Sequence, residues 1–420
     1  MRPLSRAAIL AVGSELLTPF RTDTNSLHIT AQLNRLGVDV MFKSVVGDDR
    51  DELLHAVRAA LDRVDLLVCC GGLGPTDDDV TRDVVAEALG RDVREDPGMT
   101  ERIRARYVAR GFAMPMPEIN RRQAMVPTGA RVIENRYGSA PGLWLEEGDR
   151  VVLLLPGPPG ELGPMLAAVV DSLLMERVSG TAIVRRSIKM TGRIESRTEE
   201  QLRPLYTEWS SAAVPVSATI LATLGQIELH LSARGPAAAA SEAALSAAVR
   251  QVVAVLGGDV FSTEGHELER VLGDLLVARA LRIAVAESCT GGLIASRLTD
   301  VPGSSRYLER GVVAYSNEAK TELLGVNADI IAEHGAVSEP VALAMANGIR
   351  SRARVDVGVG VTGIAGPDGG TPEKPVGTVV VAAATADWSR SRVFHFAGDR
   401  AQVKFQASQA ALDMVRRMLS

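Results

Sequence analysis

The sequence is poor in cysteine and in aromatic residues. Its three cysteines, Cys69, Cys70 and Cys289, are too few for a disulfide framework, and none belongs to a CxxC pair, which argues against structural zinc. Aromatic residues make up 4% of the chain, so its cores must be built from Val, Leu, Ile and Ala. The remaining composition, 46% hydrophobic and 23% charged, is typical of a globular protein and disfavours the disordered and fibrous classes.

Long apolar runs and an excess of basic charge are also missing. No stretch approaches the roughly 18 uninterrupted apolar residues of a membrane span, and the short apolar run Ala7–Val12 indicates a first strand rather than a signal peptide. We therefore expect a cytoplasmic protein with no membrane partner. The net charge of −5 disfavours a dedicated nucleic-acid binder, because such a protein needs basic residues to neutralise phosphates.

The length of 420 residues predicts several domains, since an ordinary domain has about 100–200 residues. In residues 1–175 short apolar strands alternate with amphipathic helices, which predicts an α/β domain with a parallel sheet covered on both faces. Residues 176–262 predict a small α+β unit with a long Ala-rich helix at Pro236–Leu256. Residues 263–420 predict a second α/β domain that ends in a helix at Arg400–Leu419.

A glycine-rich turn follows the strand predicted at Asp65–Cys70. The turn carries three glycines and then three consecutive aspartates, namely Gly71, Gly72, Gly74, Asp77, Asp78 and Asp79. Glycines between a strand and a helix let backbone N–H groups face an anion, and aspartates would repel that anion unless a divalent cation lay between them. Carboxylate and phosphate oxygens are the ligands that Mg²⁺ or Mn²⁺ prefers. The turn therefore indicates metal-assisted phosphate or pyrophosphate chemistry, with simple capping of the helix as the alternative.

A serine stands at a second turn between a strand and a helix. Ser288 follows the strand predicted at Arg282–Ala286, and Thr290, Gly291 and Gly292 open the next helix. The N–H groups of such a helix N-terminus can hold an oxyanion or a phosphate. The alternative for the serine is an N-cap of that helix.

The base that this serine needs is not supplied by a histidine in any recognisable triad context. Instead, Tyr315 and Lys320 lie five residues apart after a predicted strand. A lysine can replace histidine when burial lowers its pKa, and a tyrosine hydroxyl can bridge the proton path. A solvated lysine and a core tyrosine are the alternatives.

The N-terminal motifs resemble the molybdopterin-binding domain family of the MogA and MoeA type. Besides the glycine-rich turn, the motifs are Gly13-Ser14-Glu15-Leu16-Leu17, Asp23-Thr24-Asn25, Asn120-Arg121-Arg122-Gln123-Ala124, Gly138-Ser139-Ala140-Pro141-Gly142 and Pro156-Gly157-Pro158-Pro159. This combination resembles one branch of that family, the CinA proteins (competence/damage-inducible protein A). The resemblance implies an ADP-ribose pyrophosphatase that needs a divalent metal (Mg, Mn or Co).

By position, this resemblance implies Asp79 as a catalytic and metal-binding carboxylate and Glu15 as a second metal ligand. The substrate-binding residues that it implies are Gly71, Gly72, Gly74, Asn25, Asn120, Ser139 and Gly157.

Residues 265–420 carry motifs that resemble the CinA C-terminal family, which looks like nicotinamide-nucleotide amidohydrolases. These motifs are Ala286-Glu287-Ser288-Cys289-Thr290-Gly291-Gly292, Tyr315-Ser316-Asn317-Glu318-Ala319-Lys320, Gly363-Ile364-Ala365-Gly366-Pro367-Asp368-Gly369-Gly370 and Gly398-Asp399-Arg400. The reaction implied is hydrolysis of nicotinamide mononucleotide (NMN) to nicotinate mononucleotide and ammonia, with no metal needed.

The same resemblance implies a role for each residue of the C-terminal motifs. Ser288 attacks the carboxamide carbon, and Lys320 accepts its proton with help from Tyr315. The expected substrate-binding residues are Thr290, Gly291, Gly292, Gly363, Ala365, Gly366 and Arg400, the last as a charge partner of the phosphate.

The central segment resembles a KH-type fold in this family. Between residues 180 and 262 there is no GxxG loop of the kind that clamps nucleic acid, so a spacer or oligomerisation role is expected. The leading hypothesis is a homodimeric enzyme of pyridine-nucleotide salvage that acts on NMN and ADP-ribose. Two alternatives stay open: an N-terminal domain that binds or adenylylates molybdopterin, and a non-catalytic interaction factor in DNA uptake or repair.

Overall fold

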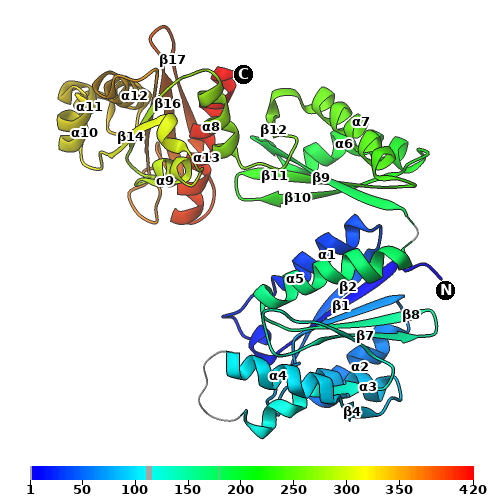
Figure 1. Ribbon diagram of the computed structural model, residues 1–420. Coiled ribbons are helices and arrows are strands. Elements are labelled where there is room, and N and C mark those ends of the chain that lie inside the picture. Colours follow the sequence, from blue (N-terminus) through cyan, green and yellow to red (C-terminus); the bar gives the residue numbers. More distant parts are fainter. Residues whose placement is uncertain (1, 110–115, 179) are drawn as a thin grey trace. The chain divides into compact units, whose positions relative to one another are not determined.

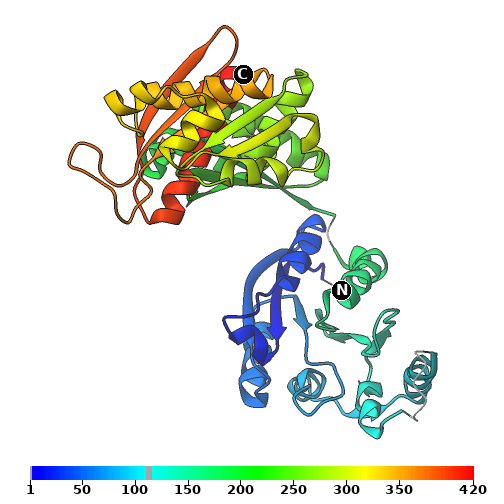
Figure 2. The same cartoon turned by 90° about the vertical axis from the view of Figure 1, so that its left-hand side faces the viewer.

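The computed structural model describes residues 2–109, 116–178 and 180–420 (Figure 1). The chain divides into two compact units: the first holds Met1–Val184 and Ala233–Ala243, and the second holds Arg185–Ser232 and Ala244–Ser420. Helices flank a sheet in each unit, as two perpendicular views show (Figure 1, Figure 2). The α/β fold class predicted from the sequence is confirmed. Most of the predicted middle domain groups with the C-terminal part of the chain.

The first unit is built on a six-stranded sheet of order β2-β1-β3-β8-β7-β6. Four strands run parallel: β1 (Arg6–Val12), β2 (Asp39–Val46), β3 (Leu66–Cys70) and β8 (Arg150–Leu155). Two antiparallel strands, β7 (Gly142–Glu147) and β6 (Arg131–Ile133), extend the sheet at one edge. The turn between β7 and β8 is too short for the crossover that a parallel pair would need.

Helices cover both faces of this sheet. α1 (Asn25–Arg35) and α5 (Pro159–Val169) pack on one face, and α2 (Arg50–Leu61) and α3 (Thr81–Ala88) pack on the other (Figure 1). The five residues of β3 are therefore all buried, which is why this strand is a continuous apolar run.

Short elements complete the first unit. They are α4 (Pro97–Ala109), β4 (Val93–Glu95), β5 (Met125–Pro127), a π-helix at Val170–Leu174 and 3₁₀ turns at Ser14–Leu17, Glu118–Ala124 and Met175–Arg177.

A second, four-stranded sheet has the order β10-β11-β9-β12. Its elements are β9 (Ala182–Thr191), α6 (Glu195–Ser210), β10 (Val216–Thr223), β11 (Gln226–Gly235), α7 (Ala238–Leu256), a 3₁₀ turn (Gly257–Asp259) and β12 (Val260–Ser262). Among the described residues, the segment Ala238–Asp259 is the one helix long and apolar enough to cross a membrane by length and composition. Leu245, Ala248 and Val252 are buried at the spacing of one helical face, so this face packs inside the protein.

The C-terminal part carries a five-stranded sheet of order β14-β13-β15-β16-β17. Its strands are β13 (Ile283–Glu287), β14 (Leu308–Val313), β15 (Val357–Gly363), β16 (Thr378–Ala384) and β17 (Ser389–His395). The first three strands in this order run parallel, whereas β16 and β17 are antiparallel to their neighbours.

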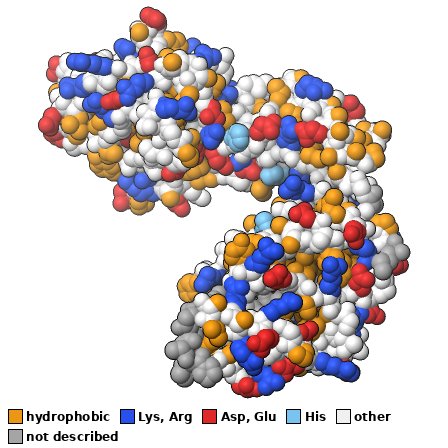
Figure 3. Space-filling view, in the orientation of Figure 1, with side chains coloured by type: hydrophobic (Ala, Val, Ile, Leu, Met, Phe, Trp, Pro, Cys, Tyr) orange, Lys and Arg blue, Asp and Glu red, His pale blue; other side chains and the backbone are white. Residues whose placement is uncertain are grey.

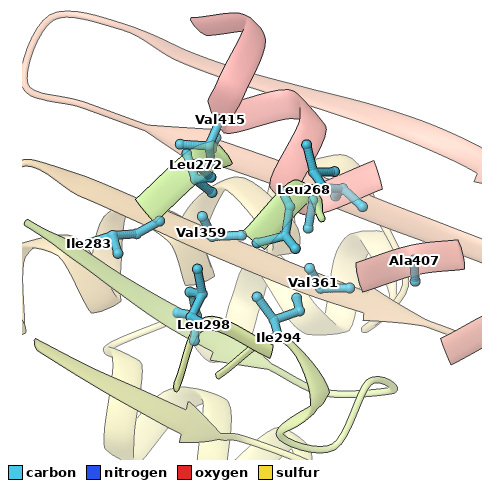
Figure 4. Packing of buried hydrophobic residues seen from close by; sticks show 14 of the residues in the cluster. Leu268, Leu272, Ile283, Ile294, Leu298, Val359, Val361, Ala407 and Val415 are labelled. Carbon is cyan, nitrogen blue, oxygen red and sulfur yellow. The ribbon is translucent and has the colours of Figure 1, made fainter. Parts of the chain in front are cut away.

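Two helical layers enclose this sheet as well. α8 (Leu268–Ala278), α9 (Leu293–Thr299) and α13 (Arg400–Leu419) share one hydrophobic core with it, part of which is shown in Figure 4. The opposite face is covered by α10 (Asn317–Leu324), α11 (Ala328–His334) and α12 (Glu339–Ala353), and a 3₁₀ turn lies at Ser304–Arg306. The predicted bounds of α13 are confirmed.

Glycines in β15 allow the helix α12 to pack close to the backbone of this strand. Val359 and Val361 face the core of Figure 4, while Gly360 between them faces α12. A Cβ atom on Gly360 would lie 2.4 Å from the carbonyl oxygen of Ala342. The strand thus alternates large and absent side chains so that α12 can pack against its backbone.

Candidate active sites

A cavity of about 440 Å³ lies where the three parallel strands of the C-terminal sheet end. Ser288 follows β13, Tyr315 follows β14 by two residues, and Gly363 ends β15. Because parallel strands bring their carboxyl ends to one edge of a sheet, these three segments meet there. Of the predicted site residues, the cavity is lined by Ser288, Tyr315, Lys320, Gly363, Ala365, Gly366 and Arg400.

Lys320 is buried beside Ser288. Its side chain is 2% exposed, and its Nζ atom lies 3.3 Å from the Oγ atom of Ser288. The ammonium group also donates to the carbonyl oxygens of Tyr315 (3.1 Å) and Ser316 (3.4 Å). Burial lowers the pKa of Lys320, because its charged form loses hydration and no described carboxylate forms an ion pair with it. The lysine is therefore suited to accept a proton from the serine.

Local sequence explains how Lys320 reaches this position. Ser316 caps α10, since its Oγ atom accepts a hydrogen bond from the N–H of Ala319 at 3.0 Å. This cap starts the helix directly after Tyr315 and places Lys320 near its N-terminus, under the cavity.

The turn after Ser288 is held by a carboxylate that the sequence reasoning did not assign to the site. Glu287 is fully buried, and its side chain accepts the N–H groups of Gly292 (3.0 Å), Ile294 (3.1 Å) and Ala295 (2.9 Å). A glutamate that ends a buried strand just before a helix is the signal that could have revealed this cap.

The expectation that Gly291 and Gly292 offer their N–H groups to substrate is not met in this structure. Glu287 accepts the N–H of Gly292, and the carbonyl oxygen of Ser288 accepts that of Gly291 at 3.1 Å. Thr290 is fully buried, and its Oγ atom has no hydrogen-bond partner among the described residues. None of these three residues lines the cavity.

Among the described residues, the hydroxyl group of Tyr315 forms its hydrogen bond with Arg400 and none with Lys320. The hydroxyl accepts a hydrogen bond from the guanidinium of Arg400 at 3.0 Å, and Arg400 also donates to the carbonyl oxygen of Gly366 at 2.8 Å. Tyr315 thus contacts Lys320 through its backbone carbonyl, and Tyr315 as a whole residue is 61% exposed. The hydroxyl orients Arg400 in this structure, and the expected bridging of the proton path is not part of the geometry.

The position of Arg400 follows from the start of α13. Asp399 caps this helix: its carboxylate accepts the N–H of Gln402, and the Gln402 side chain accepts the N–H of Asp399, both at 2.9 Å. Arg400 is the first residue of the helix. The capping box therefore fixes where its side chain leaves the backbone.

A buried arginine links α9, the helix after Ser288, to α13, the helix that begins at Arg400. Arg297 of α9 donates to Ser408 and Gln409 of α13 and to Glu269 of α8, each at 2.7 Å. The helix after Ser288 and the helix that begins at Arg400 are thereby held to each other.

A second cavity, of about 290 Å³, lies at the carboxyl ends of β1, β3 and β8 in the first unit. Of the predicted residues, it is lined by Glu15, Gly71, Gly72, Gly74, Asp79, Ser139 and Gly157. Asn25 supports the wall, since its side chain donates to the carbonyl oxygen of Gly157 at 2.6 Å. Asn120 does not line the cavity.

This second cavity is strongly acidic. Among the described residues, its lining includes five carboxylates and no lysine, arginine or histidine; the carboxylates belong to Glu15, Asp48, Asp78, Asp79 and Glu161. Asp48 and Glu161 were not identified from the sequence, and Gln123 was named only as part of a motif, without a role at the site. Within the described ranges, no three His, Cys, Asp or Glu side chains are grouped closely enough to hold a metal ion by themselves.

Asp79 is engaged with its own loop. Its carboxylate accepts the N–H of Gly74 (2.7 Å), the N–H of Thr76 (2.9 Å) and the hydroxyl of Thr76 (2.5 Å). A carboxylate has about four acceptor positions, so little capacity is left for a further ligand. By these hydrogen bonds, Asp79 stabilises the glycine-rich turn.

Comparison with known proteins gives two family matches. Residues 265–419 match the family model described as "CinA C-terminal domain", and residues 8–176 match the one described as "Probable molybdopterin binding domain". A "CinA-like protein" of Koribacter versatilis is 45% identical over 417 residues, which cover 98% of this chain and 99% of the relative.

Two solved structures are similar to parts of the chain. The competence/damage inducible protein CihA from Agrobacterium tumefaciens is 36% identical, with 38% of this chain and all of that chain covered and a TM-score of 0.36. The molybdopterin biosynthesis enzyme MoaB of Thermus thermophilus is 25% identical, with 42% of this chain and 99% of that chain covered and a TM-score of 0.28.

Replacing Glu287 with alanine is expected to lower the free energy of unfolding of the second unit by at least about 2 kcal/mol, because three N–H groups lose their acceptor. Urea unfolding measures the change. The matched control is Glu333→Ala, which removes an exposed glutamate of the same sheet domain and should stay within about 0.5 kcal/mol of the unchanged protein. Equal unfolding midpoints for the two variants would contradict the role given to Glu287.

Proposed function

The chain belongs to the CinA family, and from this premise we propose that it is a bifunctional hydrolase of pyridine-nucleotide salvage. Its C-terminal site hydrolyses NMN to nicotinate mononucleotide and ammonia, and its N-terminal site hydrolyses ADP-ribose to AMP and ribose 5-phosphate. The observation that carries the proposal is the 3.3 Å contact between the buried amino group of Lys320 and the hydroxyl of Ser288. A serine beside a lysine of lowered pKa is suited to acyl transfer.

The chemistry at the C-terminal site takes two steps. Neutral Lys320 accepts the proton of Ser288 while Oγ attacks the carboxamide carbon, and the protonated lysine then gives a proton to the departing ammonia. An acyl-enzyme ester remains on the serine. Water attacks this ester, Lys320 again takes a proton and returns it to the serine, and nicotinate mononucleotide leaves.

Arg400 is the group suited to hold the phosphate of NMN. Its guanidinium donates to a phenol oxygen and a backbone carbonyl, and no described carboxylate forms an ion pair with it. Its charge is therefore available for an anionic ligand, and the planar fork of donors matches a phosphate.

The N-terminal site is suited to a pyrophosphate only together with a divalent cation. In the part of the chain that the structure describes, five carboxylates and no basic residue line the cavity, so a pyrophosphate without a cation would be repelled. Carboxylate oxygens are the donors that Mg²⁺, Mn²⁺ or Co²⁺ accepts, and a cation that keeps waters and substrate oxygens needs only one or two of them. Glu15 and the remaining acceptor position of Asp79 are the expected ligands. A bound cation would neutralise the pyrophosphate and activate a water.

Ser288→Ala and Lys320→Ala are each expected to lower ammonia release from NMN at least about a thousandfold, because each removes one member of the nucleophile–base pair. A coupled ammonia assay measures this. The control is Lys43→Ala, which removes an exposed lysine of the other unit and should keep full activity. Full activity in both site variants would refute the assignment.

The rate of ammonia release is expected to rise with pH. Lys320 must be neutral to accept a proton, and burial lowers its pKa from 10.5. kcat/KM should therefore increase as pH rises toward this lowered pKa and level off above it. The measurement is the pH profile of kcat/KM on NMN. A rate that falls across the same range would contradict a neutral lysine base.

Chelation of divalent metals is expected to separate the two activities. EDTA should abolish AMP release from ADP-ribose and leave ammonia release from NMN unchanged, since only the first site depends on a cation. Chromatography of the nucleotides follows the first reaction, and restored AMP release after adding Mg²⁺, Mn²⁺ or Co²⁺ is the control. AMP release that survives chelation, or adenylylation of molybdopterin in its place, would count against the N-terminal assignment.

A further inference from the structure

Two opposite charges stand without ion-pair partners on the wall of the C-terminal cavity. Of the residues that the structure describes, Asp368 is the only acidic one that lines this cavity. Among the described residues, no hydrogen bond or ion pair is formed by its carboxylate. Arg400 lines the same cavity, and its two acceptors, the hydroxyl of Tyr315 and the carbonyl of Gly366, are neutral. Neither charge is therefore compensated inside the protein.

The loop that carries Asp368 is ordered by its own contacts. Arg400 holds the carbonyl of Gly366, two residues before Asp368. After Asp368 in the chain, the N–H of Thr371 donates to the carbonyl of Lys374 at 2.9 Å. The backbone on both sides of the carboxylate is thus constrained, which keeps its charge at the cavity.

Asp368 and Arg400 are both solvent-exposed, so water screens their charges when no ligand is bound, and a ligand of opposite charge can pair with each as it displaces that water. A cavity with one such anion and one such cation favours a zwitterion. The substrate of the proposed function is one: its pyridinium ring is positive, and its phosphate is negative. If Arg400 binds the phosphate, the positively charged pyridinium ring is the group that remains to pair with the carboxylate of Asp368.

We infer that Asp368 is a specificity-determining residue that recognises the positive charge of the pyridinium ring. This inference rests on the proposed deamidation of NMN. It assigns selection between charged and neutral rings to one carboxylate, apart from the serine and lysine that carry out the chemistry. The alternative is that Asp368 accepts a hydrogen bond from a ribose hydroxyl. In that case, it would favour substrates with a charged ring and substrates with a neutral ring equally.

The test compares NMN with its reduced form, in which a neutral 1,4-dihydropyridine ring carries the same carboxamide, ribose and phosphate. The ratio of kcat/KM for the two substrates is measured in the unchanged protein and in Asp368→Asn. The two rings differ in intrinsic reactivity, and this difference cancels when the ratios are compared between proteins. Asp368→Asn is expected to lower the preference for the charged ring by roughly threefold to tenfold, as befits a single solvated charge pair.

Two controls accompany this comparison. Asp387→Asn makes the same change in an exposed aspartate of the turn between β16 and β17, and it should leave the ratio unchanged. Raised salt should lower the preference in the unchanged protein and have little effect in Asp368→Asn, because screening acts on the charge that the variant lacks.

The possible failures are distinguishable. If the unchanged protein releases ammonia from neither substrate, the proposed function fails. If it releases ammonia and Asp368→Asn slows both substrates equally or neither, the charge recognition is overturned while the proposed function stands.

Discussion

The C-terminal site depends on burying the amino group of Lys320 without giving it a carboxylate. A paired lysine would stay protonated and could not act as a base. Here the amino group is satisfied by two backbone carbonyls and the serine hydroxyl. The capped start of α10 supplies those carbonyls, and Lys320 itself is 2% exposed.

A buried carboxylate, that of Glu287, immediately precedes the same serine in the chain, and its hydrogen-bond partners are separate from those of Lys320. Glu287 is satisfied by N–H groups at the start of α9 and forms no ion pair with a described residue. If Glu287 were paired with Lys320 instead, the turn after Ser288 would lose the hydrogen bonds that Glu287 accepts. The ion pair would also stabilise the protonated form of Lys320. The fold keeps these two charges apart by giving each its own backbone partners.

The two cavities occupy equivalent places, at the carboxyl ends of parallel strands, and differ in charge. Counting the described residues, five carboxylates line the first cavity, whereas one carboxylate, a lysine and an arginine line the second. Under the proposed function, the same architecture would serve a cation-dependent reaction in one unit and lysine-assisted acyl transfer in the other. On the face shown in Figure 3, basic and acidic side chains are interspersed.

Sequence patterns alone determined the α/β class, the strand–turn–helix settings of Ser288 and the glycine-rich turn, and the bounds of α13, because apolar periodicity and glycines act locally. Local patterns could not show that β7 and β6 pair antiparallel, or that Asp48 and Glu161 reach the first cavity, since these contacts join distant segments. Only the tertiary structure decided that Lys320 is buried against Ser288, that the Tyr315 hydroxyl turns to Arg400, and that Glu287 takes the N–H groups expected for substrate. The reason is physical: burial, ion pairing and the direction of a side chain depend on what the rest of the chain packs around it.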